Sequence, residues 1–121
     1  MAIHVYVAGP YTVPDPVQNT RRAVLAAEQL LSAGLVPFVP HLSLFWEYLV
    51  PRPWAGWLQD YDLPWLRRCD VLLVLPGESV GAGVERRQAA DLGLPVFESV
   101  AAIIDAHARG ELAQRVGPGA S

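Results

Sequence analysis

The chain has 121 residues, a net charge of −3 at neutral pH and 52% hydrophobic residues. This length and apolar content indicate one folded domain and exclude a disordered chain. The acidic and basic residues are interspersed, which excludes the basic stripe of a nucleic-acid-binding protein. All nine basic residues are arginines, so a Schiff-base lysine and the lysine of a P-loop are also excluded.

Cysteine and histidine usage limits the redox and metal chemistry. Cys69 is the only cysteine, so no disulfide forms within the chain, and we expect a buried, inert thiol. The three histidines and this cysteine lack metal-ligand spacing, so we expect no metal and no cofactor. Apolar runs are too short for a membrane span, and no signal peptide precedes the first strand-like segment, so we expect a cytoplasmic protein without a membrane partner.

The first forty residues predict a strand, a helix and a second strand. Residues 2–8 are apolar and rich in β-branched and aromatic side chains, as in a buried strand. Asp15 is a suitable N-cap for a helix over about 17–33, and Gly34 is the expected stop. Residues 35–39 predict the second strand.

The aromatic-rich stretch 41–57 holds three of the four tryptophans. It predicts a short helix over 43–48 followed by a loop. Three roles for its aromatic side chains stay open from the sequence: lining a base-binding pocket, packing as a lid on the core, or forming a subunit interface. A helix over about 58–68 follows, with Pro64 near its start or breaking it.

The second half of the chain repeats the alternation of strand and helix. Residues 70–75 (DVLLVL) give the strongest strand pattern, and a helix is predicted over about 81–92. A short strand over 94–97 and a helix that starts at 100 and ends at about 107 or at 114 complete the domain. Residues 116–121 predict a flexible tail after a single domain over 1–115.

Strands that alternate with helices and carry nearly continuous apolar runs are typical of a parallel sheet covered on both faces. The sequence therefore predicts an α/β fold: a small doubly wound, Rossmann-like or flavodoxin-like sheet of four to five strands. Such folds bind ligands beyond the carboxyl ends of the strands. The sequence places Gly9-Pro10-Tyr11, Pro40-His41 and residues 76–83 at those ends.

Residues 76–85 (PGESVGAGVE) follow the strongest strand and open a helix. Gly81 and Gly83 allow the backbone to approach a ligand, and N–H groups at a helix N-terminus attract anions. Glu85 falls near this positive end, which we expect to keep its carboxylate ionised, as a nucleophile or electrostatic stabiliser requires. The alternative is that an acidic residue is simply favoured in the first turn of a helix.

Asp62 is the second candidate carboxylate. It precedes Pro64, so it is either functional or a helix cap. Cleavage of an N-glycosidic bond passes through an oxocarbenium-like sugar, and glycoside chemistry commonly uses a carboxylate pair for this purpose. A retaining route uses one carboxylate as the nucleophile and forms a glycosyl-enzyme intermediate.

Three segments together resemble the nucleoside 2-deoxyribosyltransferase-like superfamily, especially the 2′-deoxynucleoside 5′-monophosphate N-hydrolases. Val5–Tyr11 (VYVAGPY) is similar to the family's opening strand and sugar-phosphate loop. Asp62–Asp70 (DLPWLRRCD) resembles its D-L-x-W-L-x-x-x-D segment, and Ser79–Glu85 (SVGAGVE) resembles its S-x-G-x-G-x-E motif. The resemblance covers residues from about 3 to 97.

The resemblance implies a small-molecule nucleoside or nucleotide substrate, a nucleophilic Glu85, an Asp62 that holds the sugar or assists the departing base, and a Tyr11 near the nucleophile. It implies a homodimer or higher homo-oligomer. The substrate-binding residues that it implies are Gly9, Pro10, His41, Ser79, Gly81 and Gly83. Unlike the phosphate-binding relatives, the first loop has no arginine before Arg21, which leaves a 5′-phosphate requirement open, with Asn19 and Arg21 as candidate substitutes.

Two other functions compete with an N-glycosidase or deoxyribosyltransferase. A noncatalytic nucleotide-binding or nucleotide-sensing module of the same fold keeps the pocket without turnover, and convergence of Asp62 and Glu85 within about one sugar's width argues against it. A phosphoribohydrolase of the lysine-decarboxylase-like type shares a glycine-rich turn followed by a glutamate. Its P-G-G-x-G-T motif differs from PGESVG at residues 76–81.

Overall fold

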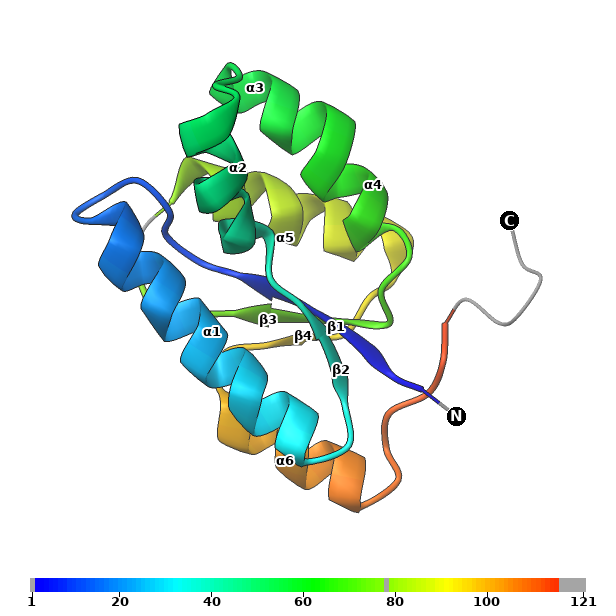
Figure 1. Ribbon diagram of the computed structural model, residues 1–121. Coiled ribbons are helices and arrows are strands. Elements are labelled where there is room, and N and C mark those ends of the chain that lie inside the picture. The colour runs from blue at the N-terminus through cyan, green and yellow to red at the C-terminus, as the bar shows by residue number, and fades with distance from the viewer. Residues whose placement is uncertain (1, 78, 116–121) are drawn as a thin grey trace.

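The computed structural model describes residues 2–77 and 79–115, which form an α/β fold around one parallel sheet (Figure 1). The sheet has the order β2-β1-β3-β4, which confirms the predicted doubly wound topology with four strands. Because β2 and β3 flank β1 on opposite sides, strand order reverses between β1 and β3, and a ligand crevice is expected there. The strands are β1 (His4–Ala8), β2 (Val36–Phe38), β3 (Val71–Val74) and β4 (Val96–Phe97).

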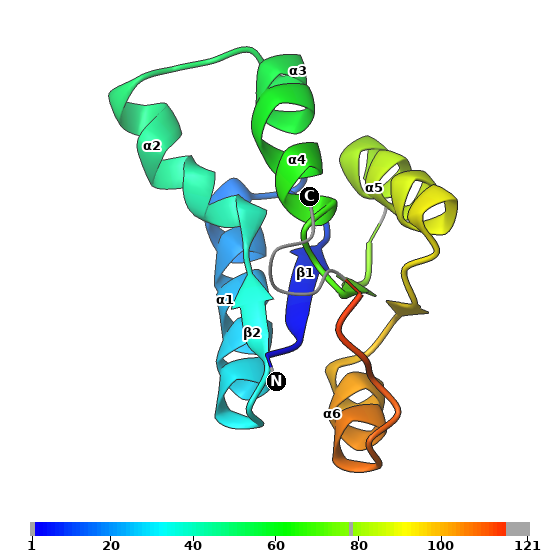
Figure 2. The same ribbon diagram turned by 90° about the vertical axis from the view of Figure 1, so that its right-hand side faces the viewer.

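Two helices cover one face of the sheet (Figure 2). Helix α1 (Pro16–Ser32) begins at Asp15, whose carboxylate accepts the Val17 N–H at 3.0 Å, as the sequence predicted. Helix α6 (Val100–Ala108) packs beside it and is capped by Ser99. Within the described residues, no helix is long and apolar enough to cross a membrane.

The other face is covered by α5 (Val80–Leu92) and by a helical stretch that runs from residue 54 to residue 66. This stretch consists of α3 (Trp54–Trp57), a π-helical turn η2 (Leu58–Asp62) and α4 (Leu63–Leu66). Pro64 is the second residue of α4, near the start of that helix, as the sequence predicted. A proline lacks the N–H of a regular turn and clashes with the carbonyl four residues earlier, and the wider π turn just before Pro64 accommodates both defects.

The segment between β2 and α3 begins with a single turn, η1 (Pro40–Leu42), that leads into α2 (Ser43–Leu49), close to the short helix predicted there. Glu47 of α2 fixes the loop that follows, because its carboxylate accepts the backbone N–H of Arg52 and the indole N–H of Trp57, the latter at 2.5 Å. The loop therefore presents α3 to the carboxyl edge of the sheet.

Side chains of β1 alternate between the two faces of the sheet. Val5 and Val7 pack with α1, whereas Tyr6 and Ala8 pack with α4 and α5. Tyr6 is completely buried, and its hydroxyl therefore needs a hydrogen-bond partner on the α5 side. This alternation positions the tyrosine directly beneath the candidate site.

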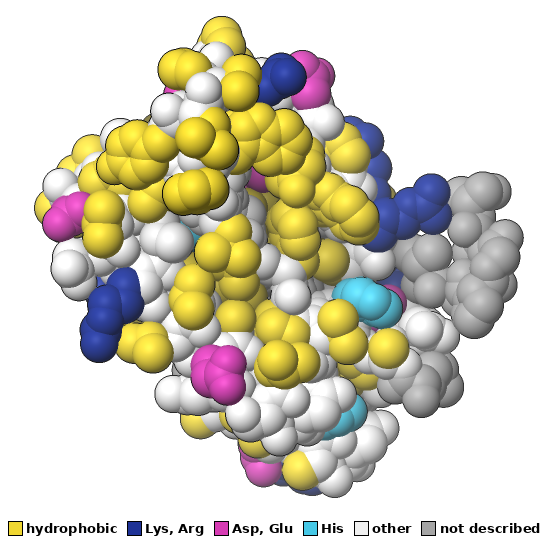
Figure 3. All heavy atoms as spheres, viewed as in Figure 1, with side chains coloured by type: hydrophobic (Ala, Val, Ile, Leu, Met, Phe, Trp, Pro, Cys, Tyr) yellow, Lys and Arg dark blue, Asp and Glu magenta, His cyan; other side chains and the backbone are white. Residues whose placement is uncertain are grey.

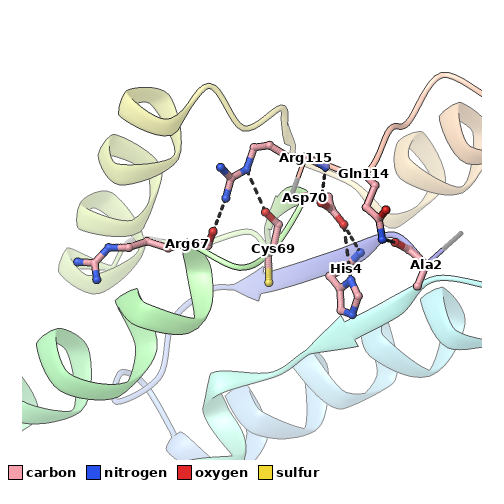
Figure 4. A network of polar contacts seen from close by, with 7 residues as sticks. All are labelled: Ala2, His4, Arg67, Cys69, Asp70, Gln114 and Arg115. Atoms are coloured by element: carbon pink, nitrogen blue, oxygen red, sulfur yellow. Dashed lines mark hydrogen bonds and ion pairs between the residues drawn. The ribbon is translucent and has the colours of Figure 1, made fainter. Parts of the chain in front are cut away.

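The opposite, amino edge of the sheet is closed by the segment that follows α6 (Figure 4). The buried carboxylate of Asp70 accepts the backbone N–H groups of His4 at 2.8 Å and of Arg115 at 2.6 Å, and the Arg115 guanidinium donates to the carbonyls of Arg67 and Cys69. Burial raises the pKa of the Cys69 thiol to about 12, in agreement with the inert thiol predicted. The predicted tail, 116–121, lies outside the described residues.

Candidate active site

A small cavity of about 60 Å³ lies at the carboxyl edge of the sheet. The loops after three strands meet there: Gly9 and Tyr11 follow β1, His41 follows β2, and Ser79 and Gly81 follow β3. These are the strand ends at which the sequence predicted a ligand site. The carboxylates of Asp62 and Glu85 complete the polar part of the wall, and Trp54, Trp57 and Leu58 form part of its apolar side.

Glu85 lies in the second turn of α5, with 5% of its surface exposed. The Tyr6 hydroxyl donates a hydrogen bond to its Oε2 atom. Burial raises the pKa of Glu85 to about 8, the hydrogen bond from Tyr6 opposes that rise, and the charge of Asp62 adds to it. The expectation that the helix N-terminus keeps Glu85 ionised is therefore wrong, because the loss of water around a buried carboxylate outweighs the helix dipole.

Asp62 occupies the last position of the π turn, directly before α4. Its side chain makes no capping hydrogen bond to α4, so the helix-cap interpretation is wrong. Its Oδ1 atom is buried without a hydrogen-bond partner among the described residues. Burial raises the pKa of this carboxyl to about 7. Asp62 and Glu85 thus share one cavity and are both shifted towards the protonated form near neutral pH.

His41 is 3% exposed and is oriented by the loop after β1. Its Nε2 atom lies 3.0 Å from the carbonyl oxygen of Pro10, and its ring meets the ring of Tyr11 edge-on at 6.0 Å. Burial lowers the pKa of His41, against the effect of the nearby carbonyls of Pro10 and Gly9. The Nδ1 atom is buried and has no partner among the described residues.

The glycines of the site have different roles. A Cβ atom at Gly9 would lie 3.1 Å from the Cβ of Leu75, so Gly9 is needed for packing between the ends of β1 and β3. A Cβ at Gly81 would meet Trp54 at 3.5 Å, which is an ordinary contact. Gly83 lies in α5 and lines neither the cavity nor the groove beside it. Ser79 caps α5 by accepting the N–H of Ala82 at 3.2 Å.

A wider groove of about 510 Å³ adjoins the cavity. Tyr11, Trp54, Ser79 and Gly81 line both spaces. The groove continues over side chains from the first loop and from the start of α5, namely Pro10, Thr12, Val13 and Val80. Among the described residues that line the cavity or the groove, none is an arginine.

Asn19 shapes the first loop. It is 3% exposed, and its side-chain amide donates to the carbonyls of Tyr11 and Val13, both at 3.0 Å. Arg21 is exposed on α1. The Asn19 amide is therefore engaged with the backbone of the loop that carries Tyr11, in place of the phosphate contact considered from the sequence.

Tyr6 is the residue of the site that sequence reasoning missed. The resemblance drew attention to Tyr11, which lines the cavity, but the hydrogen bond to Glu85 comes from the tyrosine five positions earlier. The alternation of β1 carried the signal, because a tyrosine inside a buried strand must direct its hydroxyl at a polar partner. Of the three alternatives for the aromatic stretch, lining a pocket applies to Trp54 and Trp57.

A scan against protein-family models found no match, and a search of curated proteins found none. The described residues contain no group of three or more His, Cys, Asp and Glu side chains placed to hold a metal ion.

Proposed function

We propose that the protein is an N-glycosidase or deoxyribosyltransferase that acts on the N-glycosidic bond of a nucleoside or a nucleoside 5′-monophosphate. One observation carries the proposal: Asp62 and Glu85 line one small cavity at the switch point of the sheet, and burial raises the pKa of both. Strongly shifted carboxyl groups that share a cleft are characteristic of acid–base and nucleophilic catalysis.

The two carboxyl groups have complementary roles in this chemistry. Glu85 in its ionised form attacks the anomeric carbon, and the bond to the base nitrogen breaks with its electron pair moving to the base. Asp62 in its protonated form gives its proton to the departing base. Water, or a second base in a transfer, then gives a proton to the Asp62 carboxylate and attacks the anomeric carbon, and the bond to Glu85 breaks to release the carboxylate.

Tyr6 is a positioning residue in this scheme. Its hydroxyl donates to Oε2 of Glu85, which holds the carboxylate in one orientation and leaves Oε1 for attack. Burial and the neighbouring carboxylates raise the pKa of Tyr6 well above its usual value, so the phenol keeps its proton and remains a donor. A hydrogen bond to the charged form also favours ionisation of the nucleophile.

The cavity and the adjoining groove are suited to different parts of the substrate. A cavity of about 60 Å³ is smaller than the space that holds one benzene molecule, so it takes at most the reacting part of a nucleoside. The edge of the sugar ring that carries the anomeric carbon belongs beside the carboxylates, and the remainder of the molecule extends into the groove of about 510 Å³. Trp54 and Tyr11 line both spaces and offer aromatic surfaces to a planar base.

The competing interpretation is a noncatalytic nucleotide-binding module. The shared cavity of Asp62 and Glu85 favours an enzyme, because a binding site alone has no need of two buried carboxyl groups with raised pKa values. Whether water or a second base accepts the sugar is decided by the experiment below. We place the reaction in the cytoplasm, as we expect from the sequence.

The experiment is release of free base, followed by chromatography, from a panel of ribonucleosides, deoxyribonucleosides and their 5′-monophosphates. Each substrate is incubated alone and with a second free base. Base release without an acceptor identifies a hydrolase, and base exchange only with an acceptor identifies a transferase. A panel that binds and shows no turnover under either condition establishes the binding module instead.

We also propose that the protein forms a homodimer through an apolar face around α2. Figure 3 shows hydrophobic side chains gathered over this part of the molecule. Phe45 and Leu49 of α2 are 72% and 69% exposed, and Leu42 is 60% exposed. Exposed apolar patches of this kind mark protein–protein contacts. Light scattering should give a dimer mass for the wild type and for L25E on α1, and a monomer mass for the F45E/L49E double variant.

A further inference from the structure

Two residues that line the cavity each carry a buried polar atom with no hydrogen-bond partner among the described residues: Nδ1 of His41 and Oδ1 of Asp62. Buried polar atoms are nearly always hydrogen-bonded, since a group removed from water without a partner costs free energy. Two such atoms in the wall of one cavity therefore indicate a ligand that supplies their partners. The proposed function assigns a role to Asp62 and leaves His41 Nδ1 unexplained.

The tautomer of His41 follows from its other ring nitrogen. Nε2 lies 3.0 Å from the Pro10 carbonyl oxygen, and a carbonyl oxygen only accepts hydrogen bonds. Nε2 therefore carries the ring proton. In the neutral imidazole, Nδ1 then presents a lone pair, and burial favours this neutral form by lowering the pKa of the ring.

The position of the ring is fixed before a ligand arrives. The contact with Pro10 joins the turn after β2 to the loop after β1, and the edge-on ring of Tyr11 packs at 6.0 Å. Only 3% of His41 is exposed, so solvent has little access to the ring. A hydrogen-bond acceptor that is held in place and shielded from water discriminates strongly between a ligand that carries a hydrogen-bond donor and one that lacks it.

We propose that His41 Nδ1 accepts a hydrogen bond from a ring hydroxyl of the sugar, so that His41 determines which pentoses the site accepts. This inference rests on the proposed function. The neighbouring carboxylates support the assignment, because His41 lines the cavity together with Asp62 and Glu85. The anomeric edge of the sugar must lie there for Glu85 to attack. The base extends into the groove, which His41 does not line.

The test measures the effect of removing each sugar hydroxyl, in the wild type and in a variant of His41. The substrates carry one base on ribose, 2′-deoxyribose, 3′-deoxyribose and 2′,3′-dideoxyribose, and kcat/KM is measured for wild type and for His41→Phe. In the wild type, loss of the hydroxyl that meets His41 should lower kcat/KM by roughly tenfold or more beyond the effect that the same loss has in His41→Phe. Differences in intrinsic reactivity among the sugars cancel in this comparison.

A purely structural role for His41 gives a different result. His41→Phe would then lower kcat/KM by one common factor on all four sugars, and the inference would be wrong. His41→Gln serves as the conservative variant, because its amide N–H can meet the Pro10 carbonyl while its oxygen accepts from the sugar. We expect it to restore part of the discrimination, and circular dichroism checks that both variants fold.

A binding measurement separates this inference from the proposed function. In Glu85→Gln, the imidazole nitrogen resonances of the three histidines are followed by NMR, and His41 is assigned with the His41→Phe background. Saturation with a hydroxylated nucleoside should shift the His41 Nδ1 resonance, and the analogue without the hydroxyl should not. Saturation that leaves Nδ1 unchanged overturns the inference alone. A wild type that turns over no panel member overturns the proposed function.

Discussion

The Tyr6 hydroxyl donates a hydrogen bond to Oε2 of Glu85, joining the central strand β1 to the second turn of α5. Both side chains are buried, with Tyr6 fully enclosed and Glu85 5% exposed. The pair fixes the carboxylate relative to the sheet, and through it relative to Asp62 and the loop after β1. Packing of the core around Tyr6 therefore sets the orientation of the proposed nucleophile, Glu85.

Replacing Tyr6 by Phe should weaken catalysis in a pH-dependent way. The hydrogen bond lowers the pKa of Glu85, so its loss raises that pKa further and reduces the ionised fraction near neutral pH. Hydrogen bonds to charged groups are worth about 1.5–3 kcal/mol, so we expect kcat to fall roughly ten- to a hundredfold at pH 7 and to recover partly at higher pH. A pH–rate profile that matches the wild type in shape would show that Tyr6 is only a packing residue.

The wild-type pH–rate profile should be bell-shaped, with its maximum between the pKa values of about 7 for Asp62 and about 8 for Glu85. The active form carries one proton on the pair, with Glu85 ionised and Asp62 protonated; it is the minor of the two singly protonated forms, because Glu85 has the higher pKa, and it disappears when the pair gains or loses a proton. Asp62→Asn should remove the alkaline limb of kcat/KM. An alkaline limb that persists in this variant would assign that limb to another group.

Protonation of Glu85 should also appear in the free energy of unfolding. Its folded pKa, about 8, lies above the ordinary value of 4.5, so the native state holds a proton that the unfolded chain has released. This contribution to stability is fully present below pH 4.5 and is lost as the pH rises through 8. Urea unfolding should show that Glu85→Gln, which stays neutral, gains stability relative to wild type between pH 5.5 and 8.5, by on the order of a few kcal/mol. A constant difference across that range would contradict the raised pKa.

Asn19→Leu should disturb the first loop. The substitution removes the amide that satisfies the carbonyls of Tyr11 and Val13. We expect the free energy of unfolding to fall by about 1–3 kcal/mol and KM to rise for nucleosides and monophosphates alike. Arg21→Leu, at an exposed position of the same helix, is the control, with an expected change within about 0.5 kcal/mol. A KM effect confined to monophosphates would make Asn19 a phosphate ligand.

Local signals in the sequence predicted much of the fold. Asp15 caps α1, as its residue type indicated, and α5 ends at Leu92, as predicted. The meeting of the loops after β1, β2 and β3 at one cavity followed from the rule that ligand sites gather at the carboxyl edge of a parallel sheet. These features depend on short stretches of chain or on topology.

The remaining features depend on packing between distant segments. The ionisation of Glu85 is governed by how much water its neighbours exclude, and a local helix position carries no such information. The start of α4 just before Pro64 depends on the π turn that precedes it and on the burial of Trp57 and Leu58. The partner of Tyr6 became known only when β1 and α5 were placed side by side.

The most direct test of the account compares base release by wild type, Glu85→Gln and Glu98→Gln. Glu98 is an exposed carboxylate near the end of β4, so its variant controls for the same chemical change outside the site. We predict that Glu98→Gln keeps wild-type kcat/KM and that Glu85→Gln loses at least about a thousandfold, as removal of an attacking group requires. Base release that survives in Glu85→Gln would contradict the assignment of the chemistry to Glu85.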